Sequence, residues 1–129
     1  MGLLKQVAKS AITAALRPGM FLTKGNAPGI TLTFDDGPHP EYTPRVLDAL
    51  GEAGICGTFF VIGQQVRQYP SLVQRMVNEG HEIGNHTWSH SEPSRTSMTQ
   101  FMDEVRLTDN VIQEITEEEC RLMRPPRES

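Results

Sequence analysis

The stretch Thr33-Phe34-Asp35-Asp36-Gly37-Pro38 decides the fold, because it ends the first clear strand pattern of the chain on two adjacent carboxylates. Ile30, Leu32 and Phe34 recur with period two, which predicts a strand, and the Gly-Pro pair predicts a turn directly after it. Neighbouring Asp side chains repel each other at the end of a strand. We therefore expect a bound cation or a catalytic task to compensate for this repulsion.

The composition of the whole chain indicates one soluble globular domain. Its 129 residues can bury a single core, and 37% hydrophobic with 22% charged residues is an ordinary globular mixture. The net charge of −4, with no dense Lys/Arg cluster, argues against nucleic-acid binding. No apolar run is long enough to span a membrane. Cys56 and Cys120 lack C-x-x-C spacing, which favours two free thiols in a reducing compartment over a disulfide.

Residues 1–28 are predicted to form an N-terminal amphipathic helix and a linker. Apolar side chains fall at helical spacing at Leu4, Val7, Ala8, Ala11, Ile12 and Ala15. Pro18-Gly19 should end this helix. The uncharged run is marginal as a signal-peptide core, which favours a cytoplasmic protein. We expect the helix to pack on the domain, and its lysines leave weak adsorption to a membrane surface as the alternative.

Residues 29–129 are predicted to form the domain itself, in which strands and helices alternate. After the first strand the pattern predicts a helix from Thr43-Pro44 to Gly54, a strand at 58–62, a helix from Pro70 to Gly80, a strand at 81–85, a helix from Ser97 and a strand at 120–123. Such alternation implies parallel strands joined by right-handed crossovers. Active residues of these folds gather beyond the carboxyl ends of the strands.

The helix from Ser97 has an apolar face and an acidic remainder. Phe101, Val105, Ile112 and Ile115 are predicted to lie along its buried face, with Ser97-x-x-Gln100 as a capping box. The acidic residues Asp103, Glu104, Asp109 and Glu114 lie off that face.

The segment His86-Thr87-Trp88-Ser89-His90 follows the third strand and predicts a metal site. Two imidazoles four residues apart converge on one ion if the segment makes a single helical turn. Asp36 or Asp35 is the obvious third ligand, and three protein ligands are typical of a catalytic zinc site. The alternative is a pair of ordinary surface histidines. We favour the metal site because both histidines and both aspartates lie at strand ends of one sheet.

The second aspartate then has a task of its own. A divalent ion lowers the pKa of bound water from about 16 toward 7, and a neighbouring carboxylate can take the proton. Arg124, at the end of the fourth strand, can orient that carboxylate through a charge-assisted hydrogen bond. The alternative is a surface arginine at a strand exit.

These motifs together resemble the polysaccharide deacetylase family, a family of carbohydrate esterases. The resemblance rests on Thr33 to Pro38, on His86-Thr87-x-x-His90 and on Arg124-Pro125-Pro126, and it runs from about Gly29 to Pro126. It implies a partial (β/α) barrel and metal-dependent removal of acetyl groups from N-acetylated sugars of chitin-oligosaccharide or peptidoglycan type.

The resemblance also implies a role for each motif residue. Asp35 is the general base, and Asp36, His86 and His90 hold a divalent metal, usually zinc. Thr87 braces the histidine loop, Arg124 positions Asp35, and Pro125-Pro126 forms a wall of the substrate groove. His39 matches no family role, so we expect it to line the groove or the surface.

The chain also departs from the family pattern. The third motif runs into Arg127-Glu128-Ser129 instead of an aromatic residue and glycine, and the later Asp/Trp and Leu-His motifs do not occur. About four strands are predicted, where the family has seven or eight. We therefore expect an N-terminal part of the domain that retains the metal motifs and lacks the family's histidine acid.

The leading hypothesis is a polysaccharide deacetylase that acts on N-acetylated glycans. One alternative is a catalytically impaired fragment that binds metal or glycan, and another is an α/β scaffold whose histidines bind nothing. The sequence predicts neither the particular glycan nor the oligomeric state.

Overall fold

The computed structural model describes residues 21–23 and 31–126 of the chain. The strands are β1 (Phe21–Thr23), β2 (Thr31–Asp35), β3 (Thr58–Val61), β4 (Glu82–Asn85) and β5 (Leu122–Met123). The helices are α2 (Tyr42–Ala53), α3 (Gly63–Gln68), α4 (Pro70–Asn78), the 3₁₀ helix η1 (Pro93–Arg95) and α5 (Met98–Thr116). The predicted N-terminal helix and linker, and the segment 127–129, lie outside the described residues apart from β1.

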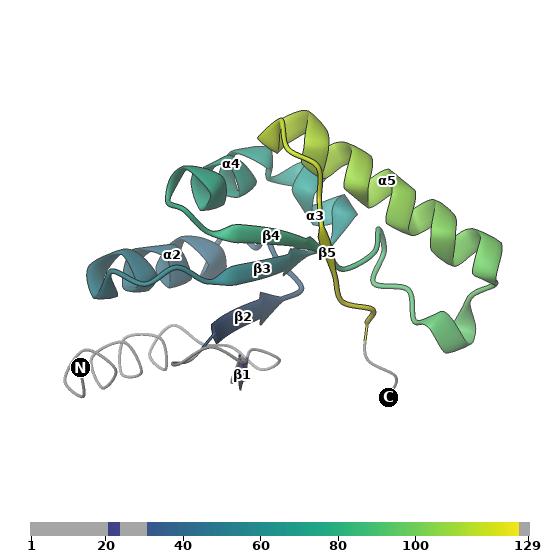
Figure 1. Cartoon of the computed structure of the whole chain (residues 1–129), viewed down its shortest axis with the longest axis horizontal. Coiled ribbons are helices and arrows are strands. Elements are labelled where there is room, and N and C mark those ends of the chain that lie inside the picture. The colour runs from purple at the N-terminus through teal and green to yellow at the C-terminus, as the bar shows by residue number, and fades with distance from the viewer. Residues whose placement is uncertain (1–20, 24–30, 127–129) are drawn as a thin grey trace.

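The strands form one sheet in the order β1-β2-β3-β4-β5, and β2 to β5 are parallel. Figure 1 shows α4, α3 and α5 above these strands. The predicted alternation of four parallel strands with helices is therefore confirmed. Within residues 21–23 and 31–126 the sheet is open and does not close into a barrel.

The sheet has two distinct faces because side chains alternate along each strand. Leu32 and Phe34 of β2 and Phe59 and Val61 of β3 point into the main core, where the rings of Phe34 and Phe59 stack at 4.9 Å. The helices contribute buried side chains to the same core: Val46, Leu47, Leu50, Val66, Val73, Met76, Val111 and Ile112. Thr33, Asp35 and the paired residues of β3 therefore lie on the other face, where Arg124 reaches them.

Two elements were not predicted. β1 pairs antiparallel with β2, but its three residues are too few to show an alternating pattern. α3 was missed because its sequence, GQQVRQ, offers a single apolar side chain, Val66, to mark a buried stripe.

The start of α2 also differs from the prediction. The helix begins at Tyr42 with Glu41 at the N-cap, one residue before the start at Thr43-Pro44 that the sequence predicts. The Thr43 hydroxyl accepts a hydrogen bond from the amide of His39 at 2.7 Å, which ties the helix to the preceding turn. At the other end, Gly54 closes the helix in the left-handed conformation, as predicted.

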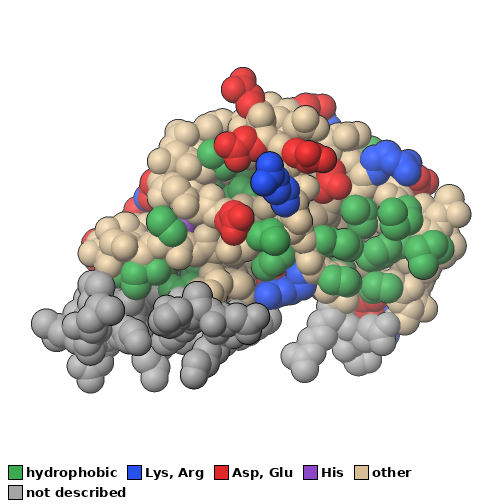
Figure 2. Space-filling model, in the orientation of Figure 1, with side chains coloured by type: hydrophobic (Ala, Val, Ile, Leu, Met, Phe, Trp, Pro, Cys, Tyr) green, Lys and Arg blue, Asp and Glu red, His purple; other side chains and the backbone are tan. Residues whose placement is uncertain are grey.

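The long helix α5 buries a shorter face than its sequence predicts. Ser97 caps it as expected, accepting from the amide of Gln100 at 3.2 Å. Its fully buried residues are Thr108, Val111 and Ile112, whereas Phe101 and Val105 are only half-buried. The first half of α5 extends past the core. Figure 2 shows hydrophobic side chains gathered over this helix, and Met98 and Met102 are among the exposed ones.

The two cysteines are free thiols, as predicted. Cys56 is exposed, and burial raises the pKa of the half-buried Cys120 to about 11, so this thiol stays protonated at neutral pH. No helix among the described residues is long and apolar enough to cross a bilayer.

His81 links the start of β4 to β3 through a buried hydrogen bond. Its Nδ1 accepts from the amide of Gly57 at 2.9 Å, and its ring packs edge-on against Phe59. The imidazole is 7% exposed, and burial lowers its pKa. Nδ1 must be unprotonated to accept, so protonation of the ring would also break this hydrogen bond.

We expect His81→Asn to make folding less sensitive to acid. The unfolded chain takes up a proton at His81 below about pH 6.5, whereas the folded chain resists it, so this histidine removes stability as the pH falls. The asparagine oxygen still accepts from Gly57 and does not titrate. Urea denaturation measures the free energy of unfolding of the variant and of the wild type. The difference between them should shift in favour of the variant by about 1 kcal/mol when the pH is lowered from 7.5 to 5. An unchanged difference would contradict this role.

Candidate metal centre and carboxylate pair

The turn after β2 sends the two adjacent aspartates in different directions. Asp35 is the last residue of β2, and its side chain follows the alternation of the strand between the two faces of the sheet. Asp36 leaves this pattern because it adopts the left-handed conformation with φ 74°. The carbonyl of Gly37 then accepts a hydrogen bond from the amide of Ile62 at 2.9 Å, which anchors the turn to the end of β3. The two carboxylates therefore reach separate partners, which reduces the repulsion expected from the sequence.

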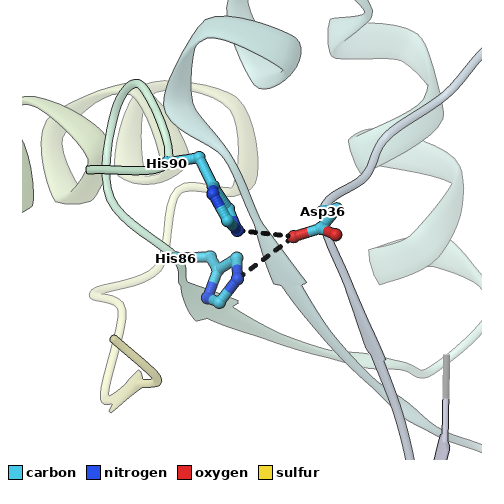
Figure 3. Close-up of side chains that lie close together, drawn as sticks. All are labelled: Asp36, His86 and His90. Atoms are coloured by element: carbon cyan, nitrogen blue, oxygen red, sulfur yellow. Dashed lines mark ion pairs between the residues drawn. The ribbon is translucent and has the colours of Figure 1, made fainter. Parts of the chain in front are cut away.

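Asp36 lies against both histidines of the predicted metal motif. Its Oδ1 is 3.2 Å from Nε2 of His86 and 3.1 Å from Nε2 of His90, as Figure 3 shows. One ligand atom from each of the three residues lies within 4.8 Å of the others. The predicted convergence of these three side chains is present.

The histidines converge through an irregular loop and not through the helical turn that the spacing suggested. Thr87 and His90 both adopt the left-handed conformation, with φ 67° and 63°. This conformation costs a residue with a Cβ about 1–2 kcal/mol, so the surroundings must hold it. Thr87 contributes directly, because its hydroxyl accepts from the amide of Ser91 at 3.1 Å and closes the loop.

Helix α3 holds the loop from one side. The amides of Gly63 and Gln64 donate to the carbonyls of Thr87 and Trp88 at 2.9 and 3.0 Å. Gly63 must be glycine for this approach, because a Cβ at that position would lie 2.3 Å from Trp88 Cε3. The short helix that sequence reasoning missed is therefore part of the site.

Asn85 connects the same loop to α5. This residue is 1% exposed, and its Nδ2 donates to the carbonyl of Val105 at 2.8 Å and to Oδ1 of Asp109 at 2.7 Å. Its Oδ1 accepts from the amide of Thr87 at 2.8 Å. Asp109, which the sequence placed off the buried face of its helix, is thus engaged with the end of β4.

The near-isosteric change Asn85→Asp tests this connection. It would remove both donors and set a carboxylate against Asp109, so we expect unfolding free energy to fall by about 2–3 kcal/mol. Asn110→Asp adds the same charge on the exposed side of α5 and should change stability by less than about 0.5 kcal/mol. Urea denaturation of both variants measures the difference. Equal effects would show that the buried hydrogen bonds of Asn85 contribute little.

The hydrogen bonds of His86 set the form of its ring. Nδ1 lies 2.6 Å from the carbonyl oxygen of Arg124, which can only accept, so Nδ1 carries the proton. Burial would lower the pKa of His86, but Asp36, the Arg124 carbonyl and the charge of Asp35 together raise it above its ordinary value. The surroundings of His86 therefore favour positive charge at this position. When the ring is neutral, its proton is on Nδ1 and the lone pair of Nε2 points at Asp36.

The donor set fits a zinc ion. Two imidazole nitrogens and a carboxylate oxygen are ordinary zinc ligands, and a histidine ligand usually donates its other N–H to a carbonyl, as His86 does. Ligand atoms about 2.1 Å from a tetrahedral zinc ion lie about 3.4 Å from one another. The 3.1 and 3.2 Å separations match this spacing closely.

Asp35 is paired with Arg124 on the other face of the sheet. Nη1 of Arg124 donates to Oδ1 of Asp35 at 3.0 Å and to the hydroxyl of Thr33 at 3.1 Å. The guanidinium lies over the ring of Phe60, 4.3 Å from its centroid. The Asp35 side chain is only 12% exposed, so the arginine both neutralises and orients a largely buried carboxylate. The alternative of a free surface arginine is wrong.

The remaining predicted residues lie nearby but differ in exposure. Pro125 is exposed and Pro126 is buried directly after Arg124. His39 stands apart from the metal cluster: its Nδ1 accepts from the amides of Glu41 and Tyr42 at 3.1 and 3.3 Å. It serves the turn before α2.

Comparison with known proteins identifies the family. The family model described as polysaccharide deacetylase matches residues 23–129. This chain therefore belongs to the polysaccharide deacetylase family, and the resemblance inferred from its motifs is confirmed.

Individual relatives agree with this family. A peptidoglycan-N-acetylglucosamine deacetylase of Bacillus cereus is 36% identical over 101 residues, which is 78% of this chain and 37% of the relative. A chitooligosaccharide deacetylase of a Bradyrhizobium strain is 48% identical over 83 residues, 64% of this chain and 38% of the relative. The structure of peptidoglycan deacetylase PdaC from Bacillus subtilis superposes with a TM-score of 0.72 at 42% identity, covering 74% of this chain and 48% of that one.

One solved neighbour carries a metal in its description. It is a family 4 acetyl xylan esterase from Clostridium thermocellum in complex with a cobalt ion, with a TM-score of 0.70, 43% identity and coverage of 74% of this chain and 47% of that one. In each comparison the chain spans less than half of the relative's length.

Proposed function

We propose that this protein removes acetyl groups from N-acetylated sugars of a chitin-oligosaccharide or peptidoglycan-type glycan. The observation that carries the proposal is the separation of the two aspartates: Asp36 faces His86 and His90, and Asp35 is held by Arg124. Amide hydrolysis with a metal needs these two features side by side, a ligand set and an independent carboxylate base. The names of the relatives supply the substrate class.

Asp36, His86 and His90 would hold a divalent metal, and zinc is our proposed ion. When bound there, such an ion acts as a Lewis acid toward the acetyl carbonyl and promotes the ionisation of water. Three protein ligands leave coordination positions for these groups. The hydrogen bond from His86 Nδ1 to the carbonyl of Arg124 keeps that ring in the form that ligates.

Asp35 is the general base in this proposal. The carboxylate takes a proton from the attacking water, which raises the rate only if the carboxylate is ionised and correctly placed. Arg124 places the carboxylate through its hydrogen bond to Oδ1, and Phe60 and Thr33 hold the guanidinium in turn. Thr87 maintains the histidine loop, and Pro125-Pro126 lines the glycan groove.

The first test separates the roles of the two aspartates. Asp36→Ala should weaken zinc affinity by more than about 100-fold, beyond what the loss of a supporting hydrogen bond costs. Asp35→Asn should leave zinc affinity unchanged and lower any acetate release by about 10²–10⁴-fold, the usual worth of a general base. Competition with a chromophoric chelator measures affinity, and Asp103→Asn on α5 is the control. Equal loss of zinc in both aspartate variants would contradict this division.

The second test concerns turnover itself. Acetate released from chito-oligosaccharides should depend on added zinc, disappear with a chelator and return when zinc is restored. His86→Ala should abolish the zinc-dependent part. Zinc binding without acetate release above the chelated control would overturn the hydrolase assignment for this chain and leave a metal-binding domain.

A further inference from the structure

Glu104 of α5 contacts the histidine loop. Its Oε1 accepts two hydrogen bonds from Ser89, one from the backbone amide at 2.6 Å and one from the hydroxyl at 2.7 Å. Ser89 directly precedes His90. The sequence placed Glu104 off the apolar face of its helix, yet the side chain is half-buried against this loop.

The hydrogen bonds to Glu104 are of the strong, charge-assisted kind. Partial burial raises the pKa of Glu104, but the hydrogen bonds that it accepts from Ser89 outweigh this effect, so the pKa is lowered. The amide and the hydroxyl of Ser89 thus both donate to a single carboxylate. The group remains ionised at neutral pH and holds the loop as an anchor.

His90 depends on such an anchor more than His86 does. The His86 side chain is 3% exposed and is held through Nδ1 by the carbonyl of Arg124. The His90 side chain is 41% exposed, and its backbone is in the left-handed conformation. The direction of its ring therefore follows from how the backbone of residues 88–90 is held.

We infer that Glu104 is a positioning residue that fixes His90 in the geometry that binds the metal. This inference rests on the proposed metal centre, and it adds a residue that touches neither the metal nor the substrate. The carboxylate holds Ser89, Ser89 sets the backbone entering His90, and His90 Nε2 is thereby kept 3.1 Å from Asp36. α5 has other attachments, through Val111, Ile112 and Asn85, so the loss of Glu104 leaves the helix docked.

Zinc affinity of the full chain tests this inference. Glu104→Ala should weaken zinc binding by about 10-fold or more, as is usual when support for a ligand is lost. Glu104→Gln keeps an oxygen acceptor for Ser89 and should recover most of that affinity. Glu114→Ala removes an exposed acidic residue from the same helix and should have no effect. Competition with a chromophoric chelator at fixed pH provides each dissociation constant.

A double-variant cycle distinguishes positioning of His90 from a general structural effect. If Glu104 acts through His90, Glu104→Ala should change zinc affinity little once His90→Ala is present, because the two effects are not additive. Trp88 is the only tryptophan of the chain and lies inside the loop, so its metal-free emission should shift in Glu104→Ala and not in Glu114→Ala.

The outcomes separate this inference from the proposed function. Suppose that the wild type binds zinc. If Glu104→Ala binds zinc equally well, or if Glu104→Ala weakens zinc binding by the same factor in the wild type and in the His90→Ala variant, then the role of Glu104 is wrong and the metal centre stands. If the wild type binds no zinc, the metal centre is wrong and the role of Glu104 falls with it.

Discussion

The structure depends on a single change of backbone direction between two negatively charged neighbours. Asp35 continues the alternation of β2 and meets Arg124, while Asp36 turns into the left-handed region and meets two histidines. Two carboxylates one residue apart would otherwise repel each other. Each instead has its own partner, a guanidinium stacked on Phe60 for Asp35 and two imidazoles for Asp36. One turn thus supplies both the candidate metal ligand and the proposed base.

The histidine loop is held by polar contacts from three elements, because its own backbone is unfavourable. The first amides of α3 hold two loop carbonyls, Asn85 at the end of β4 joins the loop to α5, and Glu104 of α5 holds Ser89. The apolar core beneath the loop docks these elements, but apolar packing is not directional enough to orient two rings toward one oxygen. Hydrogen bonds of fixed geometry do so.

Most of the fold could be read from the sequence because its strands and helices carry strong apolar periods. Those periods predict four parallel strands and three of the helices. The residue types at the helix ends predict the glycine and serine caps. The two omissions have a common cause: β1 and α3 are too short to display a period. The buried face of α5 was predicted too far toward its N-terminus, because periodicity shows which side of a helix is apolar but not how far the core extends along it. In the candidate site the structure brings Asp36 to both histidines and pairs Asp35 with Arg124, as the motifs predicted. The sequence placed Glu104 only off the apolar face of its helix, because no local pattern marks its contact with Ser89.

The sequence by itself predicted which side chains gather at the candidate site, because ligating and basic groups follow strand ends at spacings that a parallel sheet brings to one edge. It also determined the polysaccharide deacetylase family, which the comparisons confirm. Only the tertiary structure decided which aspartate meets which partner, how the histidine loop is shaped and what holds it. These features depend on residues such as Gly63, Asn85 and Glu104, whose contacts come from elements distant in the chain. No local period records such contacts, so their geometry emerges only when the helices pack against the sheet.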